Sequence, residues 1–97
     1  MTVGPGERYD IRFQPAPRRA ISERLPESVA AAVLEFCAAA LAVNPQRGGK
    51  PLFGPLVGCH GARRGTYRIV YRIDEAARIV HVLDVDHRSD IYHQPNA

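Results

Sequence analysis

The most regular pattern in the chain is an alternation of apolar and charged side chains between residues 63 and 73. A period of two is typical of a strand with one buried face. It predicts that one face, which points into a core, carries Tyr67, Ile69, Tyr71 and Ile73, and that the opposite face carries Arg68, Val70 and Arg72. One strand can therefore close a core and present cations on its opposite face.

Before this strand the spacing of apolar residues is helical. Tyr9–Phe13 alternates and predicts an opening strand, and the prolines after it suit the first turn of a short helix over Ala16–Arg24. From Pro26 to Leu41 apolar residues recur at i, i+4, i+7 and i+8, the stripe of a core-facing helix. Asn44-Pro45 ends that helix, because a residue before proline disfavours the α region.

The second half predicts a hairpin meander. Pro45–Gly58 has the glycine and proline content of a loop, and its four large apolar residues predict that it packs onto the core. Three strands follow, centred on Cys59–Arg63, Thr66–Ile73 and Arg78–Val85.

These elements predict an α+β domain: an N-terminal strand, two antiparallel helices and an antiparallel three-stranded meander, all in one sheet. The helices cover one face and leave the other open to a partner. Ninety-seven residues make a single domain, with flexible ends expected at 1–7 and 93–97. With no apolar run near the roughly 20 residues of a membrane span and no secretory signal pattern, a cytoplasmic location is the default.

The charge distribution points to an anionic partner. The net charge is only +3, but no Asp or Glu occurs between Phe36 and Ile73, where six cations fall. A local excess of this kind favours a polyanion such as nucleic acid. The alternative is a general preference for arginine, since Lys50 is the one lysine among thirteen basic residues.

The residues that usually hold metals are scattered. Cys37 and Cys59 form no Cys-x-x-Cys pair, and the four histidines lack the His-x-x-x-His spacing of a helical site. We therefore expect buried thiols, no metal site and no cofactor.

Four blocks, taken together, resemble the RelE branch of the RelE/ParE toxin superfamily. They are Gly49–Leu52, Leu56–Gly58, Arg64–Tyr71 and His87–Tyr92, in matching order and spacing. The resemblance extends from about Tyr9 to Tyr92, and the strand–helix–helix–meander order fits the fold of that family.

The resemblance implies the toxin of a type II toxin–antitoxin pair, a ribosome-dependent endoribonuclease (mRNA interferase). Such an enzyme cuts messenger RNA in the ribosomal A site without a metal, using the 2′-hydroxyl as nucleophile. The implied partners are a cognate antitoxin, mRNA and ribosomal RNA, with operator DNA bound only through the antitoxin and no membrane. Two alternatives share the fold: a ParE-like inhibitor of DNA gyrase and an inactive, antitoxin-binding member.

The resemblance also implies site residues. Arg68 matches the strand arginine that contacts the scissile phosphate, and Arg88 matches a second phosphate-binding arginine, although an ion pair with Asp86 or Asp90 is the alternative for it. Tyr92 matches the C-terminal active-site tyrosine, which stacks on a base or transfers a proton; the alternative is an aromatic that packs the tail.

The resemblance does not supply a residue for the proton acceptor, because the lysine that usually serves in RelE-type proteins has no counterpart here. RelE-type proteins often place lysines on the strand that here reads Cys59–Arg63, and this chain has none there. His60 and His87 are the natural substitutes because imidazole titrates near neutral pH, with structural histidines as the alternative. Lys50, Arg63, Arg64 and Arg72 complete the expected RNA-binding set.

Overall fold

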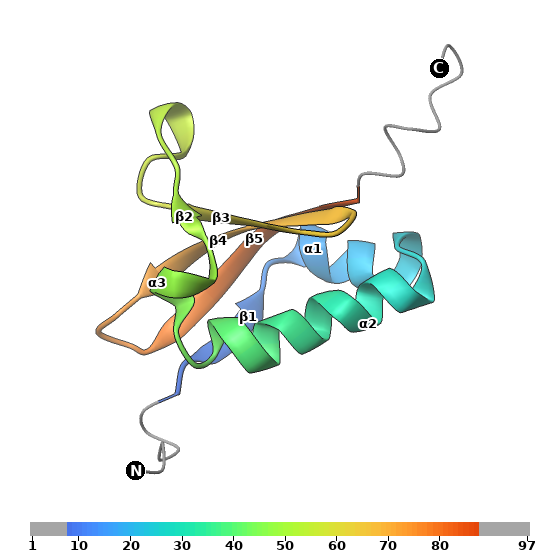
Figure 1. Ribbon diagram of the computed structural model, residues 1–97, viewed down its shortest axis with the longest axis horizontal. Coiled ribbons are helices and arrows are strands. Elements are labelled where there is room, and N and C mark those ends of the chain that lie inside the picture. Colours follow the sequence, from blue (N-terminus) through green and yellow to red (C-terminus); the bar gives the residue numbers. More distant parts are fainter. Residues whose placement is uncertain (1–7, 88–97) are drawn as a thin grey trace.

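A computed structural model describes residues 8–87 as one five-stranded sheet with helices on a single face (Figure 1). The strand order is β1-β5-β4-β3-β2. In chain order the strands are β1 (Asp10–Phe13), β2 (Lys50–Pro51), β3 (His60–Arg64), β4 (Tyr67–Asp74) and β5 (Ile79–His87). β1 runs parallel to β5 and every other pair is antiparallel. The α+β class predicted from the sequence is confirmed.

Two helical segments form a hairpin under the sheet (Figure 1). α1 (Pro15–Arg19) continues into the wider turn η2 (Ala20–Arg24), and α2 (Glu27–Phe36) continues into η3 (Cys37–Leu41). Proline stands in the first turn of α1 and at the N-cap of α2, positions whose N–H would have no helical partner. Both helices predicted from the apolar spacing are confirmed. Within residues 8–87 no helix is long and apolar enough to cross a bilayer.

The connection between helices and meander differs from the prediction. It contains a short helix, α3 (Pro45–Gly48), whose first turn is capped by the Asn44 side chain, and a single turn, η4 (Gly54–Leu56). The expectation that its apolar residues pack onto the core is wrong, since Phe53 is 83% and Val57 72% exposed. β2 pairs with β3 at only two positions, so the chain then leaves the sheet and projects from its edge (Figure 1).

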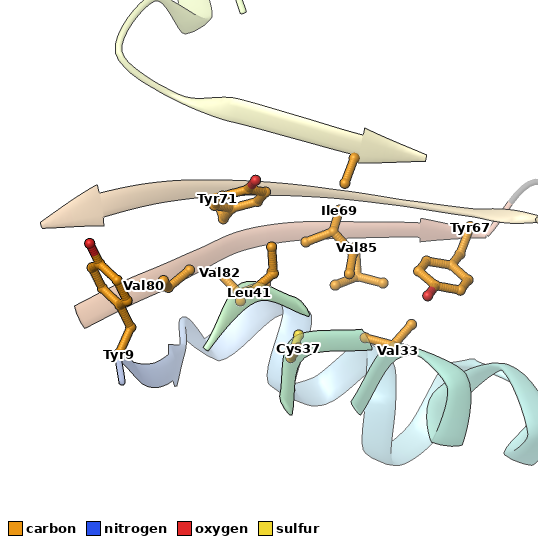
Figure 2. Packing of buried hydrophobic residues seen from close by; sticks show 11 residues of the cluster. Tyr9, Val33, Cys37, Leu41, Tyr67, Ile69, Tyr71, Val80, Val82 and Val85 are labelled. Atoms are coloured by element: carbon orange, nitrogen blue, oxygen red, sulfur yellow. The ribbon is translucent and has the colours of Figure 1, made fainter. Parts of the chain in front are cut away.

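The core lies between the sheet and the helices. Figure 2 shows side chains of β4 and β5 meeting those of the second helical segment. The buried cluster includes Tyr67, Ile69, Tyr71, Val80, Val82 and Val85 from the strands and Val33, Cys37 and Leu41 from the helix. The predicted inward face of β4 is thus confirmed, and burial raises the pKa of the Cys37 thiol to about 12.

Tyr71 joins the core to the segment that precedes β2. Its side chain is fully buried, and its hydroxyl donates to the Pro45 carbonyl oxygen at 2.5 Å. Gly49 lies so close that a Cβ there would be 2.8 Å from the same hydroxyl and 2.6 Å from the Gly61 carbonyl oxygen. Only glycine permits this approach, which brings α3 and β2 against the sheet.

An irregularity in β5 sets which side chains face the helices. Val70 pairs with Asp84 but Tyr71 pairs with Val82, so Leu83 is an extra residue, a β-bulge. Val85 therefore joins Val80 and Val82 on the covered face. Strict alternation from Val82 would have turned Asp84 toward the core; the bulge turns it to the uncovered face.

Replacing Tyr71 with Phe should lower the free energy of unfolding by about 1–3 kcal/mol, because the buried Pro45 carbonyl loses its donor. Tyr67→Phe is the matched control, since its hydroxyl donates to the Ala32 carbonyl oxygen over a longer 3.3 Å in a partly buried place. Urea unfolding of both variants measures the difference. Equal losses would mean that the Tyr71 hydroxyl has no special structural role.

Candidate functional site

The pleat of β3 and β4 separates the basic residues into two groups. Directly opposite residues on paired strands share a face, so Arg63 and Arg68 lie together on the uncovered face. Arg64 pairs with Tyr67, which is buried on the helix side. Arg63 and Arg64 are adjacent in the sequence but therefore lie on opposite faces of the sheet.

A row of charged groups crosses the uncovered face from β3 to β5. Arg63 lies opposite Arg68, and Arg68 lies opposite Asp86. The Arg68 Nη2 donates to Asp86 Oδ2 at 3.0 Å, and both side chains are about half exposed. Two arginines directly opposite one another repel, by about 0.2–1 kcal/mol. A bound anion would remove that repulsion.

The next row contributes the lysine. Lys50 pairs with Gly61, which pairs with Val70, which pairs with Asp84. The Lys50 side chain therefore leaves β2 on the uncovered face, one row of paired residues away from Arg63 and Arg68. Leu52 lies over Gly61, where a Cβ would be 3.1 Å from its Cδ2.

A pocket of about 570 Å³ opens at this edge of the sheet. β2 begins at Lys50, which pairs with Gly61 of the antiparallel β3. The last three residues of β3 therefore have no strand beside them on that side. The pocket fills this notch. Its walls are Arg47, Gly48, Gly49, Lys50, Leu52, Gly61, Ala62, Arg63, Arg64 and Arg68. Five of these ten residues are cationic and none is acidic, which suits a phosphate or another anion.

Arg64 has structural contacts that the other cations lack. Its guanidinium lies 4.7 Å from the centre of the Phe36 ring, and Nη2 donates to the Gly48 carbonyl oxygen at 3.1 Å. It thus joins β3 to the second helical segment and to α3. Arg64 lines the pocket while being held from the helix side, so part of its donor capacity is already used.

Both histidines proposed as proton acceptors lie away from Arg68. His60 pairs with Tyr71 on the helix side, with ring centres 5.5 Å apart, and its Nδ1 is buried without a hydrogen-bond partner among residues 8–87. His87 is 9% exposed and forms a 3.1 Å hydrogen bond with the Thr66 hydroxyl. The structure does not bring either imidazole to the face that carries Arg68.

Of two carboxylates on the uncovered face, the sequence reasoning passed over Asp84 and named Asp86 only as an ion-pair alternative for Arg88; both lie beside Arg68. Asp86 is its ion-pair partner, and Asp84 lies two residues earlier on the same face. Burial raises the pKa of Asp84, as do the charge of Asp86 and a hydrogen bond with it, while the nearby Arg68 acts against the rise. Val82 and Leu83 are adjacent apolar residues, a break in alternation that fits a bulge but does not specify one, since Ile79 and Val80 are adjacent as well.

Arg72 lies further along the same face. It pairs with His81 of β5, which lies on the same face. Arg72 lies four positions after Arg68 along β4, a distance of about 13 Å. Arg72 can therefore contact a second part of an extended polyanion. Arg88 and Tyr92, the remaining expected site residues, lie outside the described residues.

Comparison with known proteins identifies a family. Residues 17–92 match the model of the ParE toxin of type II toxin–antitoxin systems. Toxin RelG of Mycobacterium tuberculosis is 49% identical over 84 residues, which cover 87% of this chain and 95% of RelG. Toxin RelE of the same organism is 49% identical over 70 residues, 72% of each chain.

A solved structure agrees with these sequence matches. The toxin–antitoxin complex RelBE2 of M. tuberculosis contains a chain with a TM-score of 0.79 and 47% identity to this one. The match covers 84% of this chain and 99% of that one. Sequence and fold thus point to the same group of proteins.

Arg64 and Arg63 should differ in their effect on stability. Arg64→Ala removes the contact with the Phe36 ring and the bond to Gly48, and should lower the free energy of unfolding by about 1–2 kcal/mol. Arg63→Ala removes an exposed side chain that lies opposite a like charge, so a change within about 0.5 kcal/mol is expected. Thermal unfolding of the two variants decides; an equal loss would refute a structural role specific to Arg64.

Proposed function

Because the chain belongs to the family of ParE-type toxins of type II toxin–antitoxin systems, and within it resembles the RelE-type toxins, we propose that it is a ribosome-dependent endoribonuclease that cleaves messenger RNA. Its RelE-type relatives at 49% identity make this class the first choice over a gyrase inhibitor. Cleavage takes place in the ribosomal A site.

One observation supports the proposal most directly: the Arg68 guanidinium stands on the uncovered face, beside a pocket with five cationic and no acidic side chains. Only one Arg68 nitrogen, Nη2, has a hydrogen-bond partner among residues 8–87. The remaining donors are available to the planar, bidentate contact that arginine makes with phosphate.

Metal-free cleavage of RNA needs four things from the protein. It must hold the nucleotides in line, stabilise charge on the phosphorane, accept the 2′-hydroxyl proton and allow the leaving 5′-oxygen to be protonated. In the proposed mechanism Arg68 binds the scissile phosphate and Arg88 assists it. Lys50, Arg63 and Arg72 bind phosphates on either side, and Arg64 adds charge at the pocket wall. Tyr92 stacks on a base or takes part in proton transfer.

A protein antitoxin is the proposed partner in the cell. The relative of known structure was solved as a toxin–antitoxin complex. An antitoxin that covers the uncovered face would neutralise Arg63 and Arg68 and block RNA. We propose that contact with operator DNA occurs only through that antitoxin.

Induced expression should arrest translation, with cuts that map inside translated codons. Arg68→Ala should abolish both the arrest and the cuts, a loss of at least 100-fold, because charge on the phosphorane loses its main donor. The protein should still fold, since the Arg68 side chain is half exposed. Primer extension on a reporter message measures the cuts.

Arg12→Ala is the matched control. It removes another exposed arginine of the same face, on β1 and far from the pocket, and should leave cleavage unchanged. Replication arrest with intact message would instead indicate gyrase inhibition, and neither effect would indicate an inactive, antitoxin-binding member. A folded Arg68→Ala variant that still cuts would remove Arg68 from the mechanism.

A further inference from the structure

The two histidines expected as proton acceptors do not lie on the face where the phosphate is proposed to bind. His60 and His87 lie on the helix side of the sheet, and arginine is effectively never deprotonated. His81 is on the uncovered face but pairs with Arg72, about 13 Å along the strand from the Arg68 row. Among the described residues near the Arg68 row, the Lys50 ammonium carries only donors, so Asp84 and Asp86 of β5 are the groups that can accept a proton.

Asp84 and Asp86 are differently engaged. Asp86 holds Arg68 through its Oδ2 atom, at 3.0 Å. Asp84 makes no ion pair within residues 8–87, and it lies diagonally across the strand pair from Arg68. Diagonal neighbours on one face have Cβ atoms about 7–8 Å apart or less, within reach of one phosphodiester and its 2′-hydroxyl.

We propose that Asp84 is the proton acceptor of the cleavage reaction. The inference rests on the proposed ribonuclease function and deepens it. Asp84 takes the proton of the 2′-hydroxyl as that oxygen forms its bond to phosphorus. The bond from phosphorus to the 5′-oxygen breaks, and the leaving oxygen takes a proton from water. The products are a 2′,3′-cyclic phosphate and a 5′-hydroxyl, and Asp84 then returns its proton to solvent.

The electrostatics of Asp84 suit this role. The charged groups that act on it are Asp86 on its own strand and Arg68 on β4, with Arg72 and His81 further along the same face. The residue opposite Asp84 on β4 is Val70. Val70 is only 6% exposed although it lies on the uncovered face, so Asp84 has a buried apolar neighbour. Burial and Asp86 raise the Asp84 pKa from 3.8, toward the range in which a carboxylate is a better base near neutral pH.

A raised pKa also means that the ionised Asp84 destabilises the fold. The favourable contribution of this group is present below pH 3.8 and is lost as the pH rises through its folded pKa. Asp84→Asn should therefore be at least as stable as the parent at pH 7, with any gain absent at pH 3. Loss of cleavage in this variant cannot then be attributed to unfolding.

The test measures single-turnover cleavage of a message on purified ribosomes by the parent protein and by variants of Asp84, Asp10, His60 and His87. Asp84→Asn should slow cleavage by about 100-fold or more with ribosome binding unchanged. It should also remove the acid limb of the pH–rate profile, which is the fall in rate at low pH as the base becomes protonated. Asp84→Glu should restore part of the rate and keep the limb. Asp10→Asn, an exposed carboxylate on the same face of β1, is the matched control and should match the parent.

The outcomes separate the two proposals. If the parent cleaves and Asp84→Asn stays within threefold of it, Asp84 is not the acceptor and the ribonuclease function stands. If His60→Ala or His87→Ala removes the acid limb while Asp84→Asn keeps it, a histidine is the acceptor and the inference is wrong. If the parent does not cleave ribosome-bound message, both proposals fail together.

Discussion

The pleat of β4 is the constraint on which the rest of the structure depends. Alternate side chains of one strand must point to opposite faces, so Tyr67, Ile69 and Tyr71 build the core while Arg68 and Arg72 are held outside it. The core is thus what fixes the position of the cations. A guanidinium on a packed strand is more firmly placed than one on a loop, as binding a phosphate in a single geometry demands.

The bulge at Leu83 extends this division to β5. It keeps Val85 in the core and turns Asp84 and Asp86 toward Arg68, so that cations and carboxylates lie side by side on one uncovered surface. Bulges often occur next to functional sites, where they redirect a side chain. Two features of this surface lower the stability of the fold: the repulsion between Arg63 and Arg68, and the unfavourable ionisation of Asp84 that its raised pKa reflects. The buried cluster that contains Tyr71 offsets them.

The α+β class, the two faces of β4 and the second helical segment could be predicted from the sequence. Apolar residues follow the period of a strand in β4 and the period of a helix in the second helical segment. The exposure of Phe53 and Val57 could not be predicted, since composition does not show that β2 pairs at only two positions. Nor could the placement of His60 and His87, which depends on strand register and on the bulge. The alternation placed Arg68 correctly on the outward face. The search for a proton acceptor turned to the histidines and did not consider Asp84.

The central claim is that RNA binds the uncovered face of the sheet with its scissile phosphate at Arg68. The most direct measurement is a structure of the protein on a ribosome whose message carries a 2′-O-methyl group at the cleavage position, which blocks attack. The scissile phosphate is expected within hydrogen-bond distance of the Arg68 guanidinium, about 3 Å, with Asp84 facing the 2′-oxygen. A message that contacts the helix side of the protein, or leaves Arg68 paired only with Asp86, would contradict the claim.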